Sequence, residues 1–98
     1  FYGGAEGVAR RIARAERARE RFERTGEVEY VKAYDPAEGS TAAMFFPVDY
    51  YGNAARGAIP QWRNEFAVMG WREWLELDAL QAAPRIRVPV LMVHGDGS

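Results

Sequence analysis

The chain has 98 residues and a mass of 11.1 kDa, with 48% hydrophobic and 28% charged residues and a net charge of −1. This globular composition excludes a disordered tail, a collagen-like repeat and a membrane-spanning helix, because no apolar run approaches the roughly 20 residues that a span needs. The small net charge gives no overall attraction to nucleic acid or anionic lipid, and the lack of cysteine excludes disulfides, Cys-based zinc sites and thiol nucleophiles.

The first predicted element is a helix over residues 5–24. Apolar side chains recur along it at spacings of three and four, as on one face of an amphipathic helix: Val8, Ile12, Ala15, Ala18 and Phe22. Glu6 and Arg10 form an i,i+4 pair with the acid first, and Gly26 fits the position just past a helix C-terminus. Glutamates alternate with the many arginines, which predicts a solvated, salt-bridged face rather than a nucleic-acid-binding one.

The next segments are predicted to be short or irregular. Residues 27–34 (EVEYVKAY) favour a short strand or an extended arm, and residues 35–40 (DPAEGS) favour a turn. Residues 41–59 show no clean period and contain a dense aromatic cluster at Phe45–Tyr51. We expect an irregular, partly buried loop with a short helical turn, and loops of this length are often functional.

Two helices are predicted in residues 60–83. Pro60 fits the first position of a helix, and Trp62, Phe66 and Met69 follow at helical spacing. A second short helix is expected over residues 71–83, ending before the next proline.

The last predicted element is a strand over residues 87–94. Its continuous apolar run, Val90–Val93, is typical of a strand covered on both faces in a parallel sheet flanked by helices. A parallel sheet needs several strands and this sequence offers only one of that kind. We therefore expect the chain to be a segment of a longer protein.

The C-terminal stretch carries a family resemblance. Residues 83–97, APRIRVPVLMVHGDG, resemble a stretch of the α/β-hydrolase superfamily in which a helix leads into a buried strand and then into the turn bearing the catalytic acid. The preceding residues are similar to the cap of dienelactone-hydrolase-like enzymes, in the stretches YGGAEGVARRIARAERARERFERTGEVEYVKAY and AAMFFPVDYYGNAARGAIPQWRNEFAVMGWREWLELDAL. The resemblance implies an α/β fold, with a helical cap and short extended arm in residues 1–84 and one buried parallel strand with the acid turn in residues 85–98.

The same resemblance implies a serine-type hydrolase acting on ester or related acyl bonds of a small apolar substrate, without a cofactor and in the cytoplasm. Asp96 is the candidate acid because it is the only carboxylate of the terminal turn. It stands two positions before Ser98, where the superfamily acid usually lies, and its alternative role is a turn cap. The implied nucleophile and base are not in this sequence, so we expect the chain alone to be inactive. No nucleic-acid or membrane partner is expected, and homo-oligomer formation stays open.

Four residues are candidates for substrate binding: Trp62, Asn64, Trp71 and His94. Aromatic side chains can wall an apolar pocket, although at helical spacing they more often form core. Asn64 either binds substrate or satisfies a neighbouring backbone group. His94, the single imidazole, either lines a cleft or is hydrogen-bonded at the edge of the sheet. With one histidine and no cysteine, no metal site is expected.

A second interpretation is a self-contained α+β binding or interaction module without catalysis, with the aromatic cluster at Phe45–Tyr51 facing a partner. Such a module should pair the run Val90–Val93 with residues 27–34, the only other candidate strand. A hydrolase segment should leave this run without a partner strand in the chain.

Overall fold

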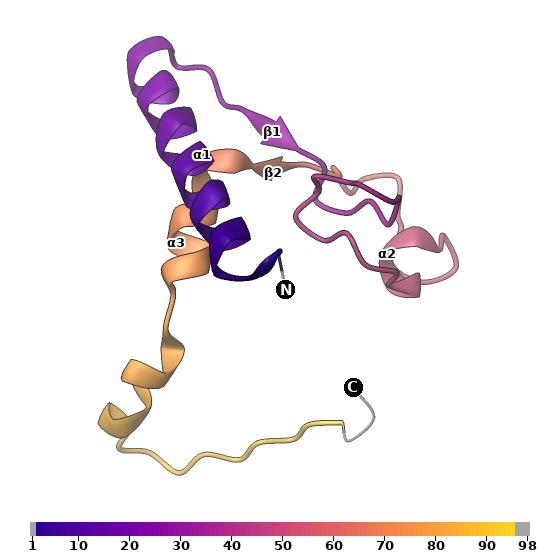
Figure 1. The fold of residues 1–98 in the computed structure, drawn as a ribbon. Helices are drawn as coiled ribbons and strands as arrows, with labels where there is room; N and C mark the ends of the chain where they lie inside the picture. Colours follow the sequence, from indigo (N-terminus) through magenta and orange to yellow (C-terminus); the bar gives the residue numbers. More distant parts are fainter. Residues whose placement is uncertain (1, 96–98) are drawn as a thin grey trace.

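The computed structural model describes residues 2–95 and shows a mixed fold built on one long helix (Figure 1). The elements in chain order are α1 (Gly4–Thr25), β1 (Tyr30–Val31), α2 (Asp49–Gly52), β2 (Phe66–Ala67), η1 (Val68–Gly70), α3 (Trp71–Glu76), η2 (Ala79–Gln81) and η3 (Ala83–Arg85). β1 and β2 form a two-stranded antiparallel sheet in which Tyr30 lies opposite Ala67 and Val31 opposite Phe66. None of the helices in residues 2–95 combines the length and the apolar character that a membrane crossing requires.

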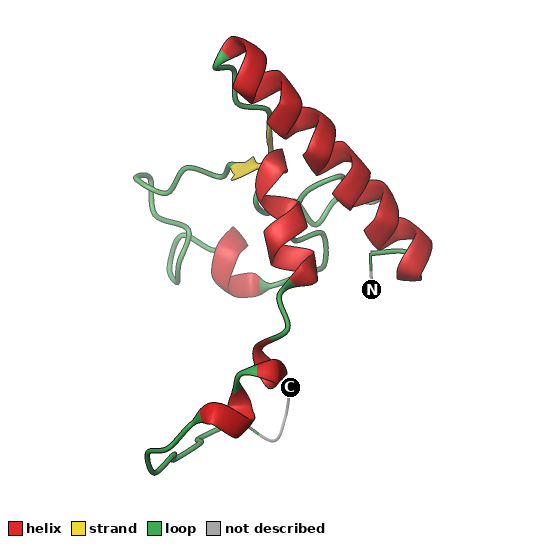
Figure 2. Cartoon of the chain, turned by 90° about the vertical axis from the view of Figure 1, so that its left-hand side faces the viewer, coloured by secondary structure: helices red, strands yellow, loops and turns green. Residues whose placement is uncertain are grey.

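The predicted N-terminal helix is confirmed as α1. Gly26 ends it in the left-handed conformation (φ 74°), and its N–H donates to the carbonyl four residues back at 2.7 Å. Glu6 and Arg10 form the expected ion pair at 2.7 Å. Ala15 and Ala18 are buried on the apolar face that packs against η1 and α3 (Figure 2). The 3.6-residue period therefore located the centre of this face, whereas Phe22 near its C-terminal end is 38% exposed.

The core is small and lies where α1 meets the segment after β2. It consists of Ala15, Ala18, Val68 and Trp71, and the last two are 0% and 1% exposed. Small side chains on α1 let the backbone of η1 and the Trp71 indole approach the helix closely. The core therefore depends on one large side chain and on the small residues that face it.

Residues 32–65 form a long excursion between the two strands (Figure 1). Within it, residues 41–59 form the expected irregular loop with a short helical turn, α2. The predicted turn over residues 35–40 is confirmed: Asp35 Oδ1 accepts a hydrogen bond from the Ala37 N–H at 3.1 Å. An isolated bridge joins Tyr34 to Met44. Tyr34, Tyr51 and Trp62 stack in sequence, with ring centroids 5.6 and 5.7 Å apart. The excursion is thus held by aromatic contacts and local hydrogen bonds.

The helix predicted from Pro60 through Met69 is wrong. The chain instead turns at residues 60–61, runs extended to β2 and then enters η1. The Val68 N–H donates to the Glu29 carbonyl at 2.9 Å, and this stretch pairs with the segment containing β1. Trp62, Phe66 and Met69 have helical spacing, but local helix propensity is only a weak preference. Backbone hydrogen bonds to the segment containing β1 therefore determine the conformation here.

The second helix is shorter than the predicted range of 71–83. α3 ends at Glu76, and Asp78 then accepts a hydrogen bond from the Leu80 N–H at 3.0 Å at the start of η2. Leu77 and Leu80 are exposed, so nothing beyond Glu76 packs against the core. A short helix without a packed face is not stable, and an aspartate that bonds the local backbone competes with it.

The predicted α/β fold, a helical cap followed by one buried parallel strand, is also wrong. The only sheet in residues 2–95 is antiparallel, and residues 86–93 form no strand within it. The apolar side chains of that stretch are 51–90% exposed: Ile86, Val88, Val90, Leu91, Met92 and Val93. Pro89 removes a ladder donor from the stretch, and the described strands leave it no parallel neighbour. It does not pair with residues 27–34 either.

Residues 77–95 thus form an arm that leaves the folded part of the chain (Figure 1). The radius of gyration is 16.7 Å, whereas a compact chain of this length has about 13 Å. The arm contributes to this extension (Figure 1). The rest of the chain carries the candidate site.

Candidate functional site

The structure places the four predicted binding residues apart. Trp71 lies in the core, Trp62 stacks on Tyr51 in the excursion, and His94 lies exposed on the arm with Nδ1 against the Gly95 carbonyl. The candidate acid, Asp96, lies outside the described residues. These side chains therefore do not converge on one site in the described part of the chain.

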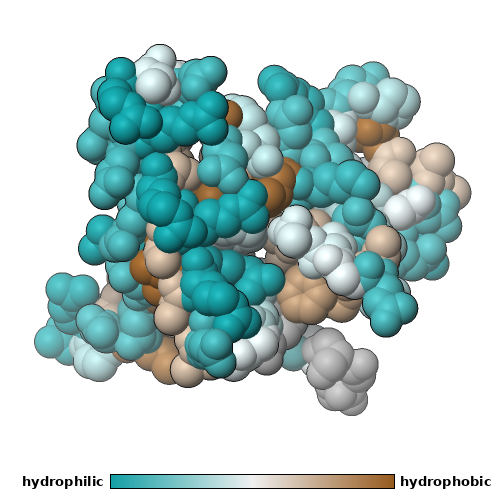
Figure 3. All heavy atoms as spheres, turned by 45° about the horizontal axis from the view of Figure 1, so that its top comes forward, coloured by the Kyte–Doolittle hydropathy of each residue, from teal (hydrophilic) through white to brown (hydrophobic). Residues whose placement is uncertain are grey.

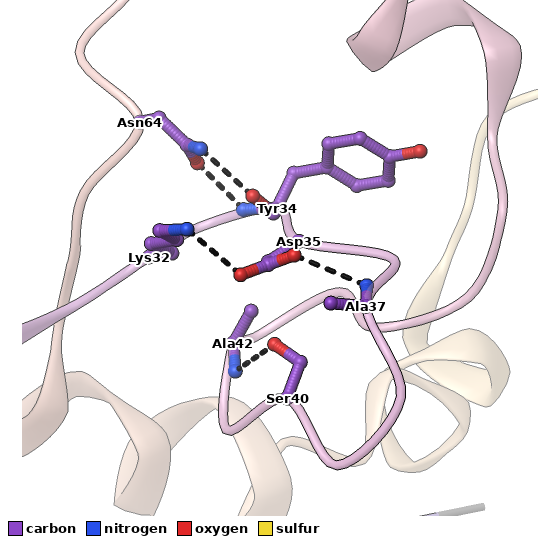
Figure 4. Close-up of polar contacts among 7 residues, drawn as sticks. All are labelled: Lys32, Tyr34, Asp35, Ala37, Ser40, Ala42 and Asn64. Atoms are coloured by element: carbon purple, nitrogen blue, oxygen red, sulfur yellow. Dashed lines mark hydrogen bonds and ion pairs between the residues drawn. The ribbon is translucent and has the colours of Figure 1, made fainter.

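Asn64 is engaged with the backbone (Figure 4). Its Oδ1 accepts from the Tyr34 N–H at 2.6 Å, and its Nδ2 donates to the Tyr34 carbonyl at 2.7 Å. The amide thus makes the pair of bonds that a neighbouring strand would make, and it holds the excursion closed across 30 positions of sequence. This geometry corresponds to the structural alternative, in which Asn64 satisfies a backbone group.

A second polar cluster lies beside Asn64 and also has a structural role (Figure 4). Asp35 accepts from Lys32 Nζ at 2.8 Å and from the Ala37 N–H, and these bonds hold the pKa of the Asp35 carboxyl below its usual value. The hydroxyl of Ser40 accepts from the Ala42 N–H at 3.2 Å. These bonds hold the turn in place.

A cavity of about 220 Å³ is lined mainly by apolar side chains, and we call it the apolar cavity. Its walls come from the N-terminus, the bridge region, β2 and α3: Tyr2, Ala33, Ala43, Met44, Phe66, Trp71 and Trp74. Phe66 and Trp71 pack with ring centroids 5.5 Å apart, which fixes one side. Trp74 is 65% exposed and forms the rim. An apolar cavity with aromatic walls is typical of a site for a small apolar ligand.

Tyr2 reaches this cavity because of Gly7. A Cβ at position 7 would lie 1.6 Å from the Tyr2 carbonyl oxygen, so only glycine lets the N-terminal residues fold back over the first turn of α1. The Tyr2 hydroxyl then donates to the Ala43 carbonyl at 2.8 Å, and its carbonyl accepts from Arg11 Nη1 at 3.0 Å. The N-terminus is thereby fixed as a wall of the cavity.

A second cavity, of about 170 Å³, shares Trp71 with the first, and we call it the arginine cavity. Its other walls are Arg10, Arg11, Arg14 and Thr41. Arg10 is paired with Glu6, and Arg14 is paired with Glu29 at 2.5 Å. Arg11 has no carboxylate partner among the described residues, so it carries the uncompensated charge of this cavity.

Arg11 lines the arginine cavity and lies against aromatic rings, two of which, Tyr2 and Trp71, line the apolar cavity. Its guanidinium carbon lies 4.4 Å from the Tyr2 ring centroid, 5.6 Å from that of Trp71 and 6.0 Å from that of Phe45. Such cation–π contacts hold the side chain in one position. Two buried donors at this junction, Arg11 Nε and Trp71 Nε1, have no hydrogen-bond acceptor in the described structure.

The rest of α1 presents the solvated face that its sequence predicts. Figure 3 shows hydrophilic side chains over most of this side of the molecule, with apolar residues in small patches between them. Ion pairs tie the helix to the segments around it, among them Arg21 with Glu27 at 2.8 Å and Arg72 with Glu16 at 3.3 Å. These charges compensate one another, whereas Arg17 and Arg24 on the same helix have no ion pair within residues 2–95 and, unlike Arg11, line neither cavity.

Sequence reasoning missed Tyr2 and Arg11 as site residues. The spacing of apolar residues on α1 does not indicate that Arg11 packs against aromatic rings. Those rings belong to Tyr2, Phe45 and Trp71, which lie outside α1. The one available signal was Gly7, a glycine within a strong helix pattern, which often marks a close approach of another backbone segment.

No group of three or more potential metal ligands occurs among residues 2–95. Comparison of the chain with protein-family models, with curated proteins and with solved structures finds no match.

Proposed function

We propose that this chain is a non-catalytic binding module whose apolar cavity takes the body of a small apolar ligand. The observation that carries this proposal is the cavity of about 220 Å³ formed by Trp71 and its neighbours. Its walls come from four separate parts of the chain, so the cavity is a product of the folded state.

The arrangement of the walls favours binding over further packing. Trp71 and Phe66 belong to the core region and are already fixed, so little conformational entropy is lost at that side when a ligand binds. Trp74 stands exposed at the rim, and a ligand in the cavity covers apolar surface of this side chain. Burial of such surface contributes about 25 cal/mol per Å².

Hydrolysis of an ester or acyl bond stays a prediction about a larger protein, and it rests on the resemblance alone. The buried strand that this prediction needs is absent from residues 2–95, and the Asp96 acid lies outside them. A small apolar substrate is common to both proposals. Release of nitrophenol from a nitrophenyl ester by the purified chain would support catalysis and contradict the binding module.

Titration with 3-phenylpropanamide, a neutral probe with one aromatic ring, tests the binding proposal. The chain has three tryptophans, and their indole N–H signals in ¹H–¹⁵N spectra report on separate regions. We expect saturable shifts of the Trp71 and Trp74 signals with a Kd of about 1 mM, the affinity typical of so small a ligand. The Trp62 signal should not move, because Trp62 packs on Tyr51 in the excursion.

Two variants distinguish binding in the apolar cavity from nonspecific binding elsewhere on the chain. Trp74→Ala removes the exposed rim and should weaken binding several-fold, while the core residues stay in place. Trp62→Phe changes a tryptophan outside the cavity and should leave the Kd unchanged. Equal effects of both variants, or shifts spread over the exposed arm, would show that the probe does not use this cavity.

A further inference from the structure

We infer that the ligand of the apolar cavity carries a carboxylate, and that Arg11 recognises it in the adjoining arginine cavity. This inference rests on the proposed binding function and names the chemical class of its ligand: a small aryl or alkyl carboxylic acid. Trp71 lines both cavities, and the Arg11 guanidinium lies 4.4 Å from the Tyr2 ring centroid and 5.6 Å from that of Trp71. We therefore place the apolar body of the ligand against Tyr2 and Trp71 and its acid group against Arg11.

The charge balance of the arginine cavity favours a single negative charge. Arg10 and Arg14 are each compensated by a glutamate, and Arg11 is the remaining cation of the wall. One carboxylate, ionised at pH 7, matches that charge, and its planar geometry fits the donor fork of a guanidinium. Thr41, a residue with a hydroxyl side chain, lines the same cavity.

The unpartnered donors provide an independent indication of the ligand. Arg11 Nε and Trp71 Nε1 are both buried and both lack an acceptor, and the Trp71 side chain is 1% exposed. Buried N–H groups are nearly always hydrogen-bonded, so two orphaned donors at one junction require an explanation. Both atoms are closed to solvent, and a carboxylate admitted between Arg11 and Trp71 supplies the acceptor that both lack.

The position of Arg11 is fixed before any ligand binds. Its Nη1 donates to the carbonyls of Tyr2 and Gly7, at 3.0 and 3.4 Å, while its guanidinium lies against the Tyr2 and Trp71 rings. Nη1 is therefore used by the backbone, and Nε lies on the opposite edge of the guanidinium. A side chain held in this way loses little freedom on binding an acid.

The test compares 3-phenylpropanoate with 3-phenylpropanamide, which have the same carbon skeleton and differ in charge. On the wild-type chain at pH 7, we expect the acid to bind about tenfold more tightly than the amide, since hydrogen bonds to a charged group are the stronger ones. The Arg11 Nε–H and Trp71 Nε1–H signals should move downfield with the acid only. Inorganic phosphate, which has no apolar body, should give no saturable shift.

Arg11→Gln should abolish the preference for the acid and leave the affinity for the amide within about twofold of wild type. Arg17→Gln is the matched control, because it removes a positive charge from the exposed side of the same helix and touches neither cavity. It should retain the preference. If Arg11→Gln does not fold, the wild-type acid-to-amide ratio and the two N–H signals still decide the question.

The outcomes distinguish this inference from the function on which it rests. Binding of neither probe overturns the binding module. Equal binding of acid and amide, with the Arg11 and Trp71 signals unmoved, leaves the module standing and overturns the carboxylate inference. Saturable binding of phosphate alone at Arg11 would also overturn it, because the site would then recognise a bare anion.

Discussion

Asn64 is the residue whose removal tests the fold most directly. Asn64→Ala deletes both hydrogen bonds to Tyr34, at 2.6 and 2.7 Å, and leaves a backbone N–H and a backbone carbonyl of a buried residue without partners. An unpaired buried polar group costs roughly 1–3 kcal/mol, and partial access to water lowers that figure. We therefore expect Asn64→Ala to lower the free energy of unfolding by about 2–4 kcal/mol.

That loss is large for a domain of this size, whose total stability is about 5–15 kcal/mol. It corresponds to a fall in Tm of at least about 10 °C. Urea denaturation followed by circular dichroism measures the free energy, and hydrogen exchange of the Tyr34 amide reports the local effect. The Tyr34 N–H should exchange slowly in the wild type and much faster in the variant.

Asn53→Ala is the matched control for this experiment. Asn53 also makes two side-chain hydrogen bonds in the excursion, to Asp49 at 3.3 Å and from the Ala55 N–H at 2.8 Å, but both are exposed. Water can replace them, so the expected loss is below about 1 kcal/mol. Equal losses for the two variants would refute the role assigned to the Asn64 bonds.

Three further predictions concern the N-terminus, the arm and the turn. Gly7→Ala should destabilise the chain by about 1–3 kcal/mol in urea denaturation, although helix propensity alone predicts a gain of about 1 kcal/mol, because its Cβ collides with the Tyr2 carbonyl. Limited trypsin digestion should cut first after Arg85 or Arg87, because the arm is exposed. First cuts within α1 would contradict the conclusion that the arm lies outside the folded part of the chain. The lowered pKa of Asp35 means that its stabilising contribution is complete above the unfolded value of about 3.9 and is lost as the pH falls through the folded value. Carboxyl ¹³C titration measures that pKa, and an unshifted value would contradict the bonds to Asp35.

The exposed arm and the proposed binding site lie in different parts of the chain. The core residues and the walls of both cavities come from residues 2–74, and the arm begins after α3. The apolar run of the arm therefore contributes nothing to the proposed ligand site. Its sequence alone suggested the opposite, a buried strand leading to a catalytic turn.

The sequence by itself determined the elements that depend on neighbouring residues. The helix α1 follows from its apolar period and from Gly26, whose left-handed conformation ends it. The turn at Asp35 follows from an aspartate that bonds the backbone two residues on. Such features need only contacts within a few positions, so a local pattern suffices to predict them.

Tertiary structure alone decided the path of residues 60–70, the exposure of residues 86–93 and the composition of the cavities. Val68 pairs with Glu29 and Asn64 with Tyr34, across 39 and 30 positions, and these bonds replaced a helix that the local spacing favoured. The run Val90–Val93 is apolar enough for a buried strand, but burial requires a neighbouring surface, which the described fold does not provide. Arg11 became a candidate ligand-binding residue only when Tyr2 and Trp71 were brought beside it. Contacts between residues far apart in the sequence produce no periodic sequence pattern. They stabilise the chain only once folding has brought those residues together.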